Sequence, residues 1–96
     1  MFEQLNQMKQ QMAELQSKMD QLRVSESVGG GVVTAEASGN GRITNLIIDH
    51  DWLKSCEAEE VSELIQLAVN RAIEAASEKH ASEMRSIAGG MMPGLL

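Results

Sequence analysis

The sequence predicts an α+β fold in which a helix, a three-stranded antiparallel sheet and a second helix follow one another within a single domain of 96 residues. Apolar residues between Leu5 and Leu22 recur at alternating intervals of three and four, which is typical of a helix with one apolar seam. Residues 33–38 alternate between apolar and small or polar types, which indicates a strand with one buried face. Residues 61–76 again carry apolar side chains at helical spacing and indicate the second helix.

The first helix is predicted over residues 1–22, which are rich in good helix formers and contain neither glycine nor proline. Its seam covers about two and a half heptads, which is short of the three or four that a free-standing coiled coil needs. We therefore expect a second copy of the chain to close the seam in a homodimer. The seam consists of Leu5, Met8, Met12, Leu15, Met19 and Leu22.

The sheet is predicted over residues 23–49, as three strands separated by glycine-rich turns. A run of three glycines follows the first strand, and the Asn-Gly pair before the third accepts the positive φ angles of a hairpin turn. In the third strand Ile43 and Ile47 are expected on one face, and Leu46 and Ile48 on the other. A sheet that is apolar on both faces must be covered on both, so Ile43 and Ile47 are predicted to face the partner chain.

The second helix is predicted over residues 56–88, after a corner formed by the segment HDWLK, in which Trp52 and Leu53 are expected to plug the core. Its first turn is acidic, which suits the positive end of the helix dipole. Alanines at positions 68, 72 and 76 would let the helix approach the sheet closely. The glycine pair at positions 89 and 90 is expected to end the helix, and residues 89–96 are predicted to form a flexible apolar tail.

The charges are unevenly distributed along the chain. The net charge of −6 argues by itself against nucleic acid as a partner. Between residues 1 and 25, however, three acidic residues balance three basic ones, so this N-terminal stretch is neutral overall. Between residues 56 and 83 there are seven acidic residues and two basic ones. The acidity therefore belongs to the second helix, which can face away from a polyanion bound at the first.

The sequence lacks the patterns of an enzyme or a metal site. The segment DHD at residues 49–51 ends a strand, where successive side chains alternate in direction and converge poorly on one ion. The single cysteine, Cys56, has no evident histidine partner and is predicted to be structural. Both glycine-rich segments lie between strands, whereas a phosphate-binding loop lies between a strand and a helix.

These observations predict a protein that is not an enzyme and has no cofactor, metal ion or small-molecule substrate. No signal-peptide pattern and no apolar run of membrane-spanning length occurs in the sequence, so we expect a cytoplasmic protein without a membrane partner.

The chain as a whole resembles the YbaB/EbfC family of small bacterial nucleoid-associated proteins. The resemblance rests on the order and spacing of four passages, which together extend over nearly the whole chain. These passages are MKQQMAELQSKM, VSESVGGGVVTAEASGNGRITNLIID, AVNRAIEAA and GGMMPGL.

The resemblance implies a homodimer whose strands build a shared β core and whose helices project from it like the arms of tweezers. It also implies binding to DNA, often with little sequence preference, and a role in nucleoid organisation and gene regulation. The sequence has no aromatic platform on which single strands could stack, so double-stranded DNA is the expected partner. Basic residues on and near the first helix are the implied phosphate contacts, and here these are Lys9, Lys18 and Arg23. Lys9 and Lys18 lie about 180° apart on the helix, on either side of the seam.

A second hypothesis is a protein-interaction adaptor that uses the methionine-rich seam and the apolar tail as adaptable surfaces. Ordinary core packing is the commonest role of a methionine stripe, and we expect it for much of the segment from Met8 to Leu22. Salt distinguishes DNA binding from the adaptor function. Phosphate binding weakens steeply as the salt concentration rises, whereas apolar docking does not.

Overall fold

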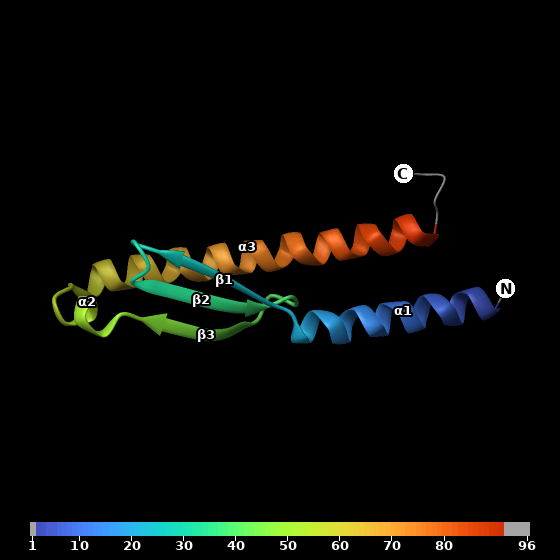
Figure 1. The fold of residues 1–96 in the computed structure, drawn as a ribbon, viewed down its shortest axis with the longest axis horizontal. Coiled ribbons are helices and arrows are strands. Elements are labelled where there is room, and N and C mark those ends of the chain that lie inside the picture. Colours follow the sequence, from blue (N-terminus) through green and yellow to red (C-terminus); the bar gives the residue numbers. More distant parts are fainter. Residues whose placement is uncertain (1, 92–96) are drawn as a thin grey trace.

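The computed structural model describes residues 2–91 and has the predicted order of helix, three-stranded antiparallel sheet and helix (Figure 1). The molecule is elongated, with extents of 63 × 23 × 16 Å, because both long helices continue beyond the same end of the sheet. The elements are α1 (Phe2–Gln21), β1 (Arg23–Val28), β2 (Val33–Ser38), β3 (Ile43–Ile48), α2 (His50–Lys54) and α3 (Ala58–Met91).

The core lies between α3 and one face of the sheet. β2 is the middle strand, and α3 packs along β2 and β1. The three alanines of α3 that were expected to permit close approach are each 0% exposed, and so are the alternate residues of β2 that face them. The core cluster consists of Val28, Val33, Ala35, Ala37, Ala68, Ala72 and Ala76. Small side chains on both sides therefore bring the helix close to the sheet.

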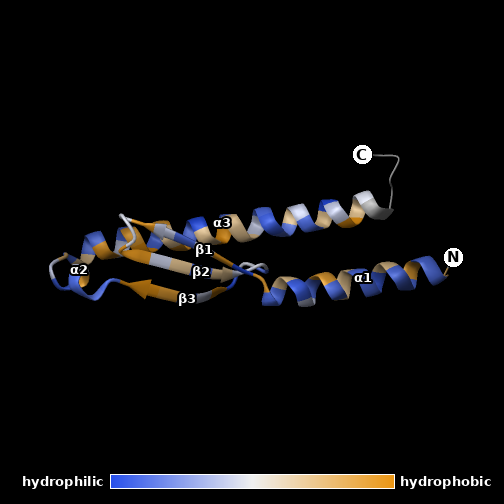
Figure 2. Ribbon diagram, viewed as in Figure 1, coloured by the Kyte–Doolittle hydropathy of each residue, from blue (hydrophilic) through white to orange (hydrophobic). Residues whose placement is uncertain are grey.

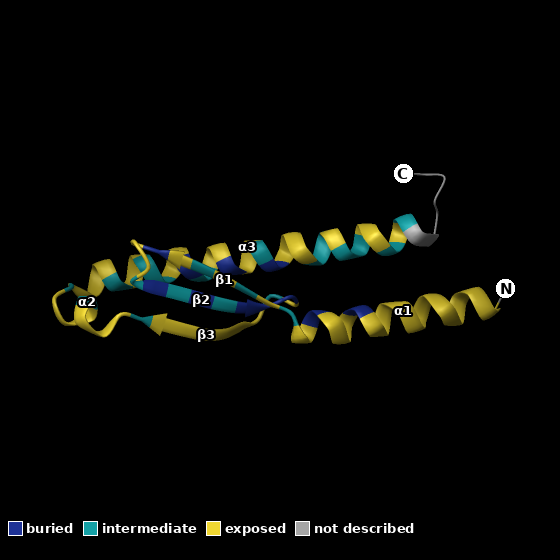
Figure 3. Ribbon diagram, viewed as in Figure 1, coloured by how far each residue is buried: buried dark blue, intermediate teal, exposed yellow. Residues whose placement is uncertain are grey.

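β3 is apolar but largely uncovered, as Figures 2 and 3 show together. β3 is an edge strand, and α3 packs over β1 and β2, which leaves β3 mostly without a helix above it. Ile43, Leu46 and Ile47 are 39%, 38% and 57% exposed. An exposed apolar edge strand is a surface on which another chain can pair or pack.

A register shift in β3 changes the face to which Ile43 belongs. Ile47 pairs with Thr34, which lies on the sheet face opposite α3, as expected. Ile43 pairs with Ala37, whose side chain lies in the core cluster, so Ile43 belongs to the face that α3 covers in part. The prediction that Ile43 and Ile47 share a face was wrong. A β-bulge adds one residue between them and thereby reverses the alternation of the strand.

The corner after β3 contains a short helix, α2, that the sequence did not predict. The Asp49 carboxylate caps it by accepting a hydrogen bond from the Trp52 backbone N–H at 2.7 Å. Trp52 packs against the core cluster, whereas Leu53 is 41% exposed, so Trp52 alone of the two plugs the corner. α3 then begins at Ala58.

α3 continues through Gly89 and Gly90 to Met91, so the prediction that this glycine pair ends the helix was wrong. Glycine destabilises a helix interior by about 1 kcal/mol relative to alanine, but it caps a helix only in the left-handed conformation. Both glycines lie inside α3, so neither occupies the capping position after the helix. The rest of the predicted tail, residues 92–96, lies outside the described residues.

α1 is attached to the sheet at its C-terminal end. Met19 is fully buried, and the Gly39 N–H after β2 donates hydrogen bonds to the carbonyl oxygens of Met19 (2.8 Å) and Leu22 (3.1 Å). A Cβ atom at Gly39 would lie 2.9 Å from both the Met19 carbonyl oxygen and its Sδ atom. The position of α1 therefore depends on the absence of a side chain at Gly39.

Gly39→Ala is expected to displace the end of α1 and to lower the free energy of unfolding by about 1–3 kcal/mol, the usual cost of overpacking. The closest contact includes a main-chain oxygen, which cannot rotate away as a side chain can. Glycine-to-alanine changes stabilise a protein where the backbone is compatible, so a loss would be diagnostic. Urea unfolding followed by circular dichroism measures the change, and a variant as stable as the parent would contradict the tight contact.

Candidate nucleic-acid interface

Beyond the sheet, α1 and α3 form two arms (Figure 1). Leu15 and Met19 of the predicted seam are buried within the chain. Leu5, Met8 and Met12 are 50%, 45% and 42% exposed, and Figure 3 shows that the N-terminal part of α1 is exposed around its whole circumference. The seam thus packs on its own chain near the sheet and is open toward its N-terminal end.

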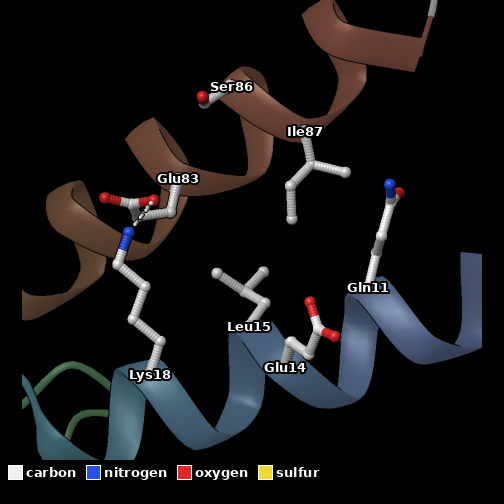
Figure 4. A pocket seen from close by; sticks show the side chains of 7 residues that line it. All are labelled: Gln11, Glu14, Leu15, Lys18, Glu83, Ser86 and Ile87. Atoms are coloured by element: carbon white, nitrogen blue, oxygen red, sulfur yellow. Dashed lines mark hydrogen bonds and ion pairs between the residues drawn. The ribbon is translucent and has the colours of Figure 1, made fainter.

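The α1–α3 groove, which lies between the two arms, has a volume of about 380 Å³. Figure 4 shows Leu15 and Ile87 pointing toward each other across it. The lining residues are Gln11, Glu14, Leu15, Lys18, Glu83, Ser86 and Ile87. The groove therefore has an apolar centre, and its one basic group stands beside carboxylates.

Lys18, a predicted phosphate contact, is paired with an acidic residue of its own chain. Its Nζ atom donates a hydrogen bond to Glu83 Oε2 at 2.9 Å, and this bond lowers the pKa of the Glu83 carboxyl group. The carboxylate therefore stays charged at and above the ordinary pKa of glutamate, and the pair persists at neutral pH. The acidic helix α3 therefore contacts α1 at this point and does not face wholly away from it. Because the two residues are 65 positions apart, no local sequence pattern predicts the pair.

Arg23, the second predicted phosphate contact, holds the junction between α1 and the sheet. Its guanidinium group donates to the carbonyl oxygens of Asp20 (2.5 Å) and Leu22 (3.0 Å), and its Nε atom lies 3.7 Å from Glu36 Oε1. A cation at this position is favourable, because the last carbonyls of a helix carry a partial negative charge. Arg23 therefore has a structural role that its place in the sequence did not reveal.

Lys9, the third predicted phosphate contact, is exposed on α1 and takes part in neither of the ion pairs found among the described residues. Its separation from Lys18 along the helix places the two residues about 14 Å apart along the axis and on opposite sides of α1. The three predicted contacts thus lie along one arm and its base, without forming a cluster.

The described residues offer little support for a catalytic or metal-binding site. Burial raises the pKa of the Cys56 thiol, and the carboxylate of Glu60 raises it further, so the thiol stays protonated at neutral pH. Within residues 2–91, no three His, Cys, Asp or Glu side chains are grouped so that they could hold a metal ion. Among the helices of this same range, none combines the length and the apolar character needed to cross a membrane.

The fold and its arms define a class of small α+β proteins in which two long helices extend from one end of a three-stranded sheet. The chain belongs to the YbaB/EbfC DNA-binding family, whose model matches residues 1–91. The family resemblance predicted from the sequence is thereby confirmed. The family is one of nucleoid-associated DNA-binding proteins and is not a known enzyme family.

Individual relatives agree with this assignment. The chain is 34% identical over 96 residues to a nucleoid-associated protein of Clostridium novyi, and the matched region covers 99% of this chain and 84% of that protein. It is 35% identical over 96 residues to a nucleoid-associated protein of Thermoanaerobacter pseudethanolicus, with 99% and 86% coverage. The crystal structure of an uncharacterized protein from Helicobacter pylori superposes with a TM-score of 0.78 at 25% identity, over 88% of this chain and 89% of that chain.

Proposed function

We propose that this protein is a homodimer that binds double-stranded DNA, mainly through phosphate contacts and with little sequence preference. Its role is in nucleoid organisation and gene regulation, and its location is the nucleoid, in the cytoplasm. The observation that carries the proposal is α1, an exposed helix that, with its junction to β1, holds Lys9, Lys18 and Arg23. Membership of a DNA-binding family supports a polyanion as the partner of these cations.

A second copy of the chain is the expected cover for two apolar surfaces. One is β3, whose outer edge has no strand partner within the described chain. The other is the open part of the seam. Leu15 and Met19 are already buried, so the predicted interface residues still available are Leu5, Met8, Met12, Ile43 and Ile47. Apolar burial contributes about 25 cal/mol per Å², which favours joining such surfaces.

Phosphate contacts account for binding without a base-reading element. Three cations per chain provide about six contacts in a dimer, and each contact lowers log K by about 0.9 for each tenfold rise in salt. Phosphate contacts orient a protein on DNA but carry no direct sequence information. The proposal therefore predicts affinities that vary strongly with salt and little with sequence.

Replacing Lys9, Lys18 and Arg23 together by Gln is expected to weaken duplex binding equally for every sequence tested. The dependence of log K on log salt should flatten by up to about 0.9 for each phosphate that the variant no longer binds. Fluorescence anisotropy with labelled random duplex, from about 25 to 200 mM salt, measures both quantities, since the relevant screening and counterion release occur in this range.

The matched control replaces Lys54, Arg71 and Arg85 by Gln, because these exposed cations lie off the α1 arm and the change in net charge is the same. The control should retain most of the affinity and the slope. Equal affinity and slope in the parent and the arm variant, with both proteins folded, would contradict DNA binding through this arm.

The adaptor function is the second candidate, and the half-exposed side chains of Leu5, Met8 and Met12 favour it. Methionine-rich surfaces adapt readily to different apolar partners. The same titration distinguishes the two candidates: a chain that binds no duplex at about 25 mM salt, where phosphate contacts are strongest, leaves the adaptor function as the better explanation.

A further inference from the structure

We propose that Glu83 competes with DNA phosphate for the Lys18 ammonium group, so that binding of a duplex breaks the tie between α1 and α3 and frees the α1 arm to move. The proposal rests on the DNA-binding function stated above and adds a regulatory contact to it. Among the described residues, the Lys18–Glu83 pair is the only ion pair that joins the two arms. A phosphate that draws Lys18 away from Glu83 therefore removes this tie between the arms.

The exposure of the two side chains makes such an exchange possible. The Lys18 side chain is 59% exposed, whereas that of Glu83 is 23% exposed. The lysine has a long flexible stem and can turn its ammonium group outward, while the carboxylate remains in the groove. A phosphate that approaches from solvent can therefore contact the Lys18 ammonium group without entering the groove beside Glu83.

Glu83 would not be left without a cation after the exchange. Lys79 lies one turn earlier on α3, at the spacing that lets side chains of opposite charge interact, and its charge already contributes to the lowered pKa of Glu83. Lys18 also has a second carboxylate nearby that competes for its ammonium group, because Glu14 lines the groove one turn earlier on α1. The exchange therefore moves one ammonium group between partners and does not strand a buried charge.

The attachment of α1 explains why breaking the pair would move the arm. Met19 is fixed against Gly39 at the base of α1, and Lys18 is the adjacent residue. Farther along α1, Leu15 and Ile87 point toward each other across the groove (Figure 4). Without the ion pair, α1 can pivot at Met19 and widen the groove.

The first test compares duplex affinity in Glu83→Gln with that in Glu78→Gln. Both variants remove one negative charge from α3, and Glu78 takes part in neither ion pair of the described residues. Glu83→Gln should bind random duplex about two- to fivefold more tightly than the control at low salt, the range expected for release of a surface ion pair. Fluorescence anisotropy and thermal melting of both variants supply the affinity and the check on folding.

The second test measures the separation of the arms. Gln11 and Ser86 are exposed and line opposite sides of the groove. Spin labels on Gln11→Cys and Ser86→Cys, in a Cys56→Ser background and diluted with unlabelled chain, report the distance within one chain. Random duplex should shift the distance distribution to longer values, and Glu83→Gln should do so without DNA.

The outcomes separate the regulatory contact from the function on which it rests. Tighter duplex binding by Glu83→Gln than by Glu78→Gln, with longer arm distances, supports the competition. Equal affinities in two folded variants, or a distance that duplex does not change, overturn it while DNA binding stands. Failure of the parent chain to bind duplex overturns both.

Discussion

Ala72→Asp is expected to prevent stable folding, with a loss of about 3–5 kcal/mol in the free energy of unfolding. Ala72 is 0% exposed in the middle of α3 and belongs to the core cluster with the alternate residues of β2. An aspartate there would bury an unpaired charge and would also exceed the space that alanine leaves. A domain of this size is stable by about 5–14 kcal/mol, so the loss is a large part of the total.

The control is Ala88→Asp, because Ala88 is an exposed alanine on the same helix. It should unfold within about 0.5 kcal/mol of the parent, as surface changes usually do. Urea unfolding followed by circular dichroism measures both variants. The protein concentration must be held constant, because dimer formation would make the apparent stability depend on it. Similar midpoints for Ala72→Asp and Ala88→Asp would contradict the packing of α3 on the sheet.

Ile47→Asp is expected to dissociate the proposed homodimer. Ile47 is 57% exposed within one chain, so in an isolated chain the change would cost little. In a dimer that covers β3, each copy would place a charge in an apolar interface, and the penalty would count twice. Light scattering after size exclusion should report twice the chain mass of 10.4 kDa for the parent and a value near the single mass for the variant.

Asn70→Asp is the control for this experiment, since Asn70 is exposed and lies on α3, away from β3. It introduces the same side chain outside the proposed interface, and it should remain dimeric. A parent that is monomeric at micromolar concentration would exclude the homodimer. A dimeric Ile47→Asp variant would instead place the interface on another surface, with the open seam of α1 as the next candidate.

Much of the fold was predictable because its elements repeat a local period. The 3.6-residue period of a helix brings Ala68, Ala72 and Ala76 onto one face, and the two-residue period of a strand does the same for Val33, Ala35 and Ala37. Both sets are buried, as these spacings predicted. The errors arose where the period breaks. The bulge in β3 moved Ile43 to the other face, and α3 continued through the glycine pair at positions 89 and 90.

The candidate site was less predictable than the fold. The sequence identified Lys9, Lys18 and Arg23 as the cations of the first helix and its end, and it identified the family. The free or paired state of each cation was decided by tertiary structure: Lys18 meets Glu83, and Arg23 meets Glu36 and the carbonyls that end α1.

The sequence by itself therefore determined the order of the two long helices and the three strands, the buried faces of β2 and α3, and the family of the protein. Tertiary structure alone decided which surfaces remain open and which charges are already paired. The physical reason is the range of the interactions involved. Periodicity follows from backbone geometry within a few residues, whereas the Lys18–Glu83 pair depends on the angle at which α1 leaves the sheet. That angle is set by the contact of Met19 with Gly39, a contact between distant parts of the chain that no local pattern encodes.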